Sequence, residues 1–312
     1  MRTLGAFFRL VRFPNLLFIA YTQTLFQYYV IIPAYHHQSG AHLSLTEKVF
    51  WLLVLASVCI AAGGYVINDY FDLNIDRVNR PKRLVIEKTI PRRHAIIWHL
   101  ILSLAGVLFS LWVSLITKNG SIVVLNTIAA ILLWLYSTTF KRRLLAGNIV
   151  ISALTAWVVL VLYFAESGLP WNMYSQAQAQ YVSSIYLYAV VYAGFAFIVS
   201  AIREAVKDME DRLGDQRHGR RTMAVAWGLR STKVYTASWL TVLFLAVASF
   251  SIYFSIRGYW VLPLVMVATV IIPCFAILRQ LWDAHTPETF ARFSQWLKWA
   301  MLGGTSSMFF LP

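Results

Sequence analysis

Residues 49–76 read VFWLLVLASVCIAAGGYVINDYFDLNID. The first nineteen positions are almost wholly apolar, and an apolar run of about 20 residues is long enough to cross a bilayer as a helix. The remaining nine positions carry Asp69, Asp72 and Asp76. Their i, i+3, i+7 spacing places the three side chains on one face of a helix. The stretch therefore predicts a membrane-spanning helix that ends in three carboxylates at the edge of the bilayer.

Apolar runs of similar length recur along the whole chain. Of its 312 residues, 59% are hydrophobic and only 13% are charged, whereas soluble domains carry roughly 25% charged residues. The predicted spans are residues 15–35, 46–67, 94–116, 121–140, 145–165, 182–202, 233–255, 259–279 and 294–311. We therefore predict an all-α, polytopic membrane protein of about nine transmembrane helices, with residues 1–312 forming a single domain.

The basic residues are distributed unevenly between the two sides of the predicted membrane. The net charge is +14, and 24 of the 27 Lys and Arg fall on the same side as the N-terminus. Only Lys48, Lys118 and Arg257 fall on the other side. This positive-inside pattern places the N-terminus and the aspartate cluster in the cytoplasm, so the expected location is the cell inner membrane. Because the positive charge is accounted for by topology and by lipid headgroups, nucleic acid is not an expected partner.

A second aspartate cluster repeats the spacing of the first. Asp208, Asp211 and Asp215 also directly follow an apolar run on the cytoplasmic side. Nine of the 13 acidic residues lie in these two regions. Six carboxylates near a bilayer need cations to neutralise them. Mg²⁺ takes one or two carboxylates together with phosphate oxygens, so we expect Mg²⁺ and a diphosphate at this site.

Basic residues flank both clusters and could contact a diphosphate. Arg77 follows the first cluster, and Arg203 and Lys207 precede the second. Lys141 stands at the cytoplasmic end of the fourth predicted span. Arg binds phosphate through a planar fork and Lys as a point charge. Any one of these residues could equally be a topology signal. For Lys141 we favour a functional role, because of the motif given below, and for Arg142 and Arg143 we favour topology.

The motifs resemble those of the UbiA superfamily of intramembrane prenyltransferases. Asn68-Asp69-x-x-Asp72-x-x-x-Asp76 is similar to its first aspartate-rich motif, and Asp208-x-x-Asp211-x-x-x-Asp215 to its second. Two further stretches agree with this resemblance, namely Arg12-Phe13-Pro14-Asn15 and Tyr136-Ser137-x-x-x-Lys141 followed by Gly147-Asn148.

The resemblance implies a helical bundle around a central cavity with a cytoplasmic cap. It implies that Mg²⁺ holds a polyprenyl diphosphate, whose prenyl group passes to a lipophilic acceptor. The implied metal ligands are Asp69, Asp72, Asp76, Asp208, Asp211 and Asp215. Tyr136 and Lys141 would act with them in catalysis, and Arg12, Asn68 and Asn148 would contact the substrate.

The acceptor is less well defined than the donor. The stretch from Arg203 to Thr222 is most similar to the geranylgeranylglycerol-phosphate geranylgeranyltransferase branch, although Ala224 replaces a proline that is frequent there. The expected acceptor is a prenylglycerol phosphate hydroxyl. An aromatic quinone precursor, such as 4-hydroxybenzoate or a naphthoate, remains an alternative. A cation-coupled transporter is a remote one, because its acids would lie within the spans. The pattern does not indicate an oligomeric state.

Overall fold

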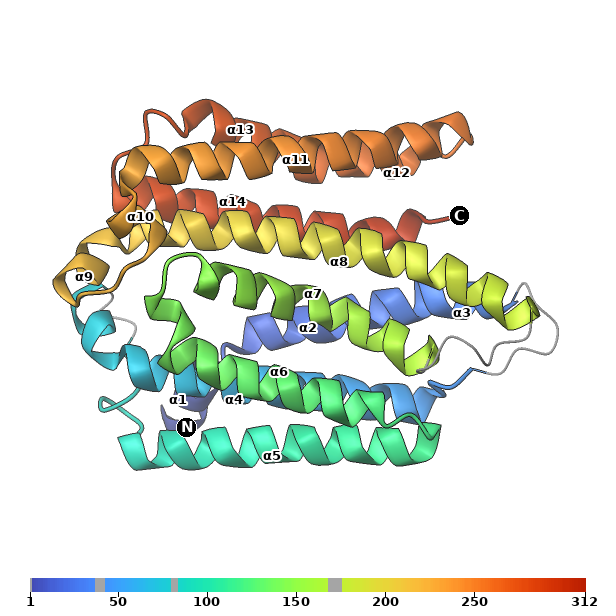
Figure 1. Cartoon of the computed structure of the whole chain (residues 1–312), viewed down its shortest axis with the longest axis horizontal. Helices are drawn as coiled ribbons and strands as arrows, with labels where there is room; N and C mark the ends of the chain where they lie inside the picture. The colour runs from blue at the N-terminus through green and yellow to red at the C-terminus, as the bar shows by residue number, and fades with distance from the viewer. Residues whose placement is uncertain (1, 37–42, 80–83, 168–175) are drawn as a thin grey trace. The chain divides into compact units, whose positions relative to one another are not determined.

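The computed structural model describes residues 2–36, 43–79, 84–167 and 176–312 (Figure 1). Within these ranges the chain is helical, and the only β feature is an isolated bridge between Ile86 and Ile90. Residues 1–140 and 157–190 form one compact unit, and residues 141–156 and 191–312 form the other. Helices α7 (Ala146–Ser167) and α8 (Gln176–Glu210) each run from one unit into the other.

The first unit is built around the 33-residue helix α4 (Glu47–Asn79), which packs along α5 (Arg92–Thr117) and α6 (Ser121–Thr138). Its other elements are α1 (Arg2–Leu10), α2 (Phe13–Phe26), the π-helical turn η1 (Gln27–Ile31) and α3 (Ile32–His36). Small residues allow α4 and α5 to approach closely. A Cβ on Gly63 would lie 2.5 Å from Ser103 Oγ, and one on Gly106 would lie 2.6 Å from Ile60 Cγ1.

Several buried polar side chains of the first unit form hydrogen bonds that link its helices, as is favourable inside a membrane. Gln23 donates to Ser57 Oγ and to the Val158 carbonyl, both at 3.0 Å, and so links α2, α4 and α7. Asn126 accepts a hydrogen bond from Trp157 Nε1 at 2.9 Å and donates to Ser110 Oγ at 2.8 Å. The Gln23 contacts hold α4, the helix that carries the first aspartate motif, against α2 and α7.

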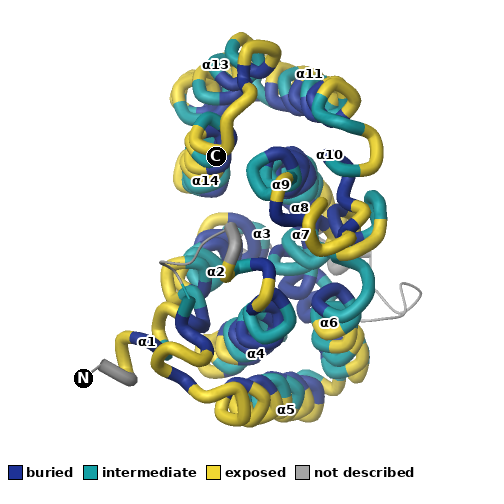
Figure 2. The backbone as a smooth tube through the Cα atoms, turned by 90° about the vertical axis from the view of Figure 1, so that its left-hand side faces the viewer, coloured by how far each residue is buried: buried dark blue, intermediate teal, exposed yellow. Residues whose placement is uncertain are grey.

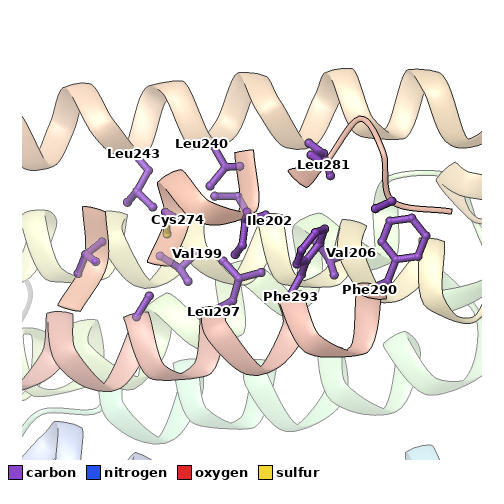
Figure 3. Close-up of a cluster of buried hydrophobic side chains, with 14 of the residues drawn as sticks. Val199, Ile202, Val206, Leu240, Leu243, Cys274, Leu281, Phe290, Phe293 and Leu297 are labelled. Carbon is purple, nitrogen blue, oxygen red and sulfur yellow. The ribbon is translucent and has the colours of Figure 1, made fainter. Parts of the chain in front are cut away.

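The second unit packs its helices around one apolar cluster (Figure 3). Its elements are η3 (Phe140–Arg142, shared with the first unit at Phe140), α9 (Arg212–Arg217), α10 (Met223–Ala226), α11 (Gly228–Ile256), α12 (Val261–Met266), η5 (Val267–Ile271), α13 (Ile272–Gln280), α14 (Pro287–Ser306) and η6 (Ser307–Phe310). Val199 and Ile202 of α8 face Leu240 of α11 and Leu297 of α14 in this cluster.

Eight segments in the described ranges are long and apolar enough to cross a membrane. They are residues 13–35, 47–77, 92–117, 121–138, 146–167, 183–210, 228–256 and 261–280. The ninth predicted span, residues 294–311, falls in α14 and η6, which are helical but are not among the eight. The all-α membrane fold is thus confirmed, and the protein is an integral membrane protein.

Helix α5 shows the surface that such a protein turns toward lipid. Nine large apolar side chains along it are more than two-fifths exposed, as the yellow stretches of α5 in Figure 2 show, and five leucines among them recur at helical spacing. They are Leu100, Leu104, Leu108, Leu111 and Leu115. A continuous exposed apolar stripe of this length would be unfavourable in water.

Candidate active site

The first aspartate motif lies on the last three turns of α4. The helix continues to Asn79 and not merely to residue 67, where the predicted span ended. Asp69, Asp72 and Asp76 therefore share one helix, as predicted. Asn68 Nδ2 donates to Asp72 Oδ2 at 2.9 Å, and both side chains are buried. This bond orients the Asp72 carboxylate.

Arg12 binds the same motif from the N-terminal side. Its Nη2 donates to Asp69 Oδ1 at 2.7 Å, and its guanidinium lies 5.1 Å from the centre of the Tyr65 ring. Arg12 adopts the left-handed conformation (φ 53°) between α1 and α2, which turns the chain toward α4. Burial alone would lower the pKa of Arg12, but Asp69, together with Tyr65 and Asp72, more than offsets this, so the pKa is raised and the guanidinium stays charged.

Arg77 forms an ion pair with Glu87. Glu87 stands in a tight turn with φ +67° and also lies 3.6 Å from Arg92 Nε. The Arg92 guanidinium in turn lies 5.2 Å from the Tyr70 ring centre. Arg77 therefore has a carboxylate partner of its own, and its contact with a diphosphate stays a prediction.

The second motif does not lie on one continuous helix, which its helical spacing had predicted. Helix α8 ends at Glu210 and α9 begins at Arg212, with Asp211 between them at φ −91° and ψ 2°. Backbone bonds nevertheless bridge the break, because Asp211 N–H donates to the Lys207 carbonyl at 2.9 Å and Asp215 N–H to the Asp211 carbonyl at 3.0 Å. The helical spacing is therefore nearly preserved, while the direction of the chain can change at Asp211.

Asn148, at the start of α7, contacts the second motif in the way that Asn68 contacts the first. Its Nδ2 donates to Asp208 Oδ2 at 3.2 Å. Arg203, one turn earlier on α8, donates from Nη1 to Glu204 Oε1 at 3.2 Å. Each of the two motifs thus contains an aspartate whose carboxylate is oriented by an asparagine amide, Asp72 in the first and Asp208 in the second.

Arg220 is a residue at this site that sequence reasoning missed. Its Nη1 lies 3.6 Å from Asp215 Oδ1, and both side chains are buried. Gly219 has φ +68° and ends α9 in a left-handed turn. The N–H of Arg220 donates to the Asp215 carbonyl at 3.0 Å and that of Gly219 to the Gln216 carbonyl at 3.3 Å, which is a Schellman motif. Gly219 is the sequence feature that could have predicted this contact, because the turn at Gly219 brings Arg220 back beside Asp215.

Tyr136 and Lys141 fall in different units, so the structure does not define their joint geometry. Tyr136 is buried in α6 of the first unit. Lys141 lies in η3 and belongs to the second unit. The Arg221 N–H donates to the carbonyl of the next residue, Arg142, at 3.3 Å. This bond ties the Lys141 turn to the loop that follows the second motif.

The donor set suits Mg²⁺. In the described ranges, no group of three or more His, Cys, Asp or Glu side chains is placed so that it could hold a metal ion. Mg²⁺ does not need such a group, because it usually takes one or two carboxylates and completes its shell with water and substrate phosphates. Asp72 and Asp208 each have a carboxylate that is oriented by an asparagine, and carboxylate oxygens are the kind of ligand that a hard cation takes.

Comparison with known proteins identifies the family. The profile of the UbiA prenyltransferase family matches residues 28–302. The chain is 28% identical over 253 residues to digeranylgeranylglyceryl phosphate synthase of Methanosphaera stadtmanae, covering 80% of this chain and 84% of that protein. It is 30% identical over 252 residues to the synthase of the same name from Sulfurisphaera tokodaii, covering 80% and 78%.

A solved structure shares the fold. The UbiA homologue from Archaeoglobus fulgidus bound to DMAPP and Mg²⁺ is 16% identical, with a TM-score of 0.60, and the match covers 98% of this chain and 99% of that one. The sequence motifs, the helical membrane fold and the family match over most of the chain agree. The chain belongs to the UbiA prenyltransferase family and is an integral membrane transferase.

Proposed function

We propose that this protein transfers a geranylgeranyl group from its diphosphate to the hydroxyl of a prenylglycerol phosphate, in a reaction that depends on Mg²⁺. The observation that carries the proposal is the similarity, over four-fifths of the chain, to relatives named digeranylgeranylglyceryl phosphate synthase. The repeated aspartate motifs support a diphosphate donor. The Archaeoglobus homologue, which holds DMAPP and Mg²⁺, supports the same cofactor and the same class of donor here.

The carboxylates of the two motifs would bind the donor through Mg²⁺. Asp72, oriented by Asn68, would serve from the first motif, and Asp208, oriented by Asn148, from the second. Asp69, Asp76, Asp211 and Asp215 complete the proposed ligand set. Bound Mg²⁺ would neutralise the charge that develops on the departing diphosphate. The residues proposed to contact the diphosphate or the cation are Arg12, Arg77, Tyr136, Lys141, Arg203 and Lys207.

The transfer itself breaks the bond between C1 of the prenyl chain and the diphosphate oxygen. The electron pair leaves with the diphosphate, and the hydroxyl oxygen of the acceptor captures the allylic carbon to form an ether. The hydroxyl proton passes to the released diphosphate, so that atoms and charge balance. Positive residues held near the motifs stabilise the leaving group, because a buried cation interacts more strongly with developing negative charge than one in water.

The proposal extends to location and organisation. The positive-inside distribution of Lys and Arg supports a cytoplasmic N-terminus and cytoplasmic motifs, in a cell inner membrane. The family match over residues 28–302 includes most of both units, which supports a single functional domain across residues 1–312.

A competition assay tests the acceptor. The purified chain in nanodiscs would receive labelled geranylgeranyl diphosphate, Mg²⁺, and equal amounts of geranylgeranylglycerol phosphate, 4-hydroxybenzoate and a dihydroxynaphthoate. We expect the label on the glycerol phosphate. Label on an aromatic acid alone would overturn the acceptor and retain the donor site. No transfer to any acceptor, with intact protein and Mg²⁺ present, would contradict the proposed activity under these conditions.

A further inference from the structure

Helix α1 has an apolar side that its own unit covers only in part. Ala6 and Leu10 are fully buried and belong to the core cluster that α1 shares with α4. Leu4 and Phe8, which stand one turn apart on the adjacent side of the helix, are 61% and 41% exposed. Arg9 is exposed next to Phe8. The uncovered surface of α1 therefore combines two large apolar side chains with a positive charge.

The contacts of α1 place it at the level where α5 enters the hydrocarbon. The Phe7 ring lies 4.8 Å from the Trp98 ring of α5. Along α5 the exposed residues change within one turn from Arg93 to the apolar Ile96 and Ile97. Such a change from basic to apolar side chains, with a tryptophan beside it, is typical of the headgroup boundary of a membrane protein. Helix α1 packs against this boundary and not against the middle of the span.

The exposed surface of α1 is continuous with the membrane-spanning surface. The Phe8 ring lies 5.0 Å from the ring of Phe13. Phe13 is the first residue of the spanning segment 13–35 and is itself 40% exposed. An apolar surface that begins on the membrane-facing side of α2 thus extends over Phe8 to Leu4.

We propose that α1 is an interfacial helix that lies in the bilayer surface. Leu4 and Phe8 insert among the upper acyl chains, and Arg9 lies at the phosphates of acidic phospholipids. Helices with one apolar and one basic face bind in this way, with their apolar side chains roughly 5–10 Å into the headgroup and acyl boundary. Basic residues next to anionic lipid strengthen such binding. The occupant of this surface is therefore the bilayer itself.

This placement has a consequence for the site, and only the consequence depends on the proposed function. Arg12 follows α1 by two residues and carries the contact with Asp69. An α1 that is held in the bilayer surface fixes the position of Arg12 relative to the membrane. The helix would thereby position the Arg12 guanidinium on the first aspartate motif.

Spin-label accessibility in proteoliposomes tests the placement directly. Nitroxide labels are attached to Leu4→Cys and Phe8→Cys in the full-length chain with Cys59→Ala, and Cys274 is kept because it is buried. Gly5→Cys is the matched control on the neighbouring side of α1, since a Cβ there meets no atom within 4 Å. Leu100→Cys reports lipid, and Lys88→Cys reports water. The same chain without an added cysteine measures background labelling.

We expect the labels at positions 4 and 8 to collide more with oxygen than with a water-soluble nickel chelate, as the label at position 100 does. The label at position 5 should favour the chelate. If the labels at positions 4 and 8 behaved like the one at position 88, the proposal would be overturned. Dipolar broadening between labels of different chains, with oxygen excluded, would assign the surface to a second copy and would also overturn it.

A charge reversal tests the lipid chemistry separately. Arg9→Glu should make the label at position 8 shallower in vesicles that contain phosphatidylglycerol, and Arg9→Gln should have an intermediate effect. In vesicles of phosphatidylcholine alone, the label at position 8 should lie at the same depth whether residue 9 is Arg, Gln or Glu. Equal depths in both kinds of vesicle would overturn the role of Arg9. Neither measurement requires enzymatic activity, so failure of this inference can be distinguished from failure of the proposed function.

Discussion

Replacing Arg12 by methionine should weaken the Mg²⁺-dependent use of prenyl diphosphate. Arg12 donates to Asp69 at 2.7 Å and lies 5.1 Å from the Tyr65 ring centre. Methionine keeps much of the apolar stem but removes the charge, the hydrogen bond and the interaction with the ring. Asp69 would then lose the contact that orients its carboxylate.

The expected size follows from these two contacts. A hydrogen bond to a charged group contributes about 1.5–3 kcal/mol. The lower half of that range applies here, because the side chains of Arg12 and Asp69 are 36% and 23% exposed. A partly exposed cation–π contact adds about 0.5–1 kcal/mol. The total of about 2–3 kcal/mol corresponds to a loss of roughly 30- to 150-fold in kcat/KM for the diphosphate. Arg12→Lys keeps the charge without the planar fork and should lose less.

The assay is prenyl transfer in nanodiscs over a range of Mg²⁺ and donor concentrations, with thermal unfolding measured in parallel. Arg143→Gln is the control, because the Arg143 side chain is exposed and we assign its charge to membrane topology. If Arg12→Met matched this control, Arg12 would have no role in the site. If it lowered the Mg²⁺ requirement, Arg12 would be a competitor of the metal for Asp69, and the reasoning would be refuted.

Three further predictions concern the same site. Lys141→Ala should raise the KM for the diphosphate at least about tenfold, as expected for loss of a charged contact, whereas Arg143→Ala should leave it nearly unchanged. Equal effects in the transfer assay would mean that Lys141 is a topology charge. Asn148→Ala should raise the Mg²⁺ concentration for half-maximal activity about tenfold, because it removes the bond to Asp208; an unaltered Mg²⁺ titration would contradict a role for Asp208 as a ligand. Excess chelator should stop transfer and added Mg²⁺ should restore it, and turnover that persists in chelator would exclude the metal site.

The first motif could be predicted from the sequence because its geometry is local. The spacing of Asp69, Asp72 and Asp76 is helical, and the structure confirms one helix. The predicted end of the span at residue 67 was too early for the helix. The apolar run marks where the chain leaves the bilayer, whereas the helix ends where its backbone hydrogen bonds end. No glycine or proline interrupts residues 68–79, so the helix continues past the apolar run.

The second motif shows where helical spacing is insufficient. The same pattern predicts the same face, but the chain leaves regular helical geometry at Asp211. Backbone bonds across the break keep the spacing, so the pattern of side chains carries no trace of it. A single residue near φ −91° has no signature in the sequence, because many residue types adopt that conformation.

The ion pairs of the site also could not be predicted. Glu87 forms its ion pair with Arg77 from a turn in which Glu87 itself has a positive φ. Because positive φ is uncommon in residues other than glycine, the sequence does not predict this turn. Arg220 meets Asp215 because Gly219 reverses the chain. Gly219 can be read from the sequence. A glycine directly after a helix is typical of a Schellman turn, which reverses the chain and brings the next residue back beside the end of the helix.

The most direct test of a Mg²⁺-dependent diphosphate site is equilibrium binding of a non-reactive thiol analogue of geranylgeranyl diphosphate to the chain in nanodiscs, with and without Mg²⁺. Wild type is compared with Asp72→Asn and Asp211→Asn, which keep the side-chain volume and remove one charge from each motif. We expect wild type to bind only with Mg²⁺, and both variants to lose most of this affinity while remaining folded. Tight binding in chelator, or wild-type affinity in both variants, would contradict this expectation.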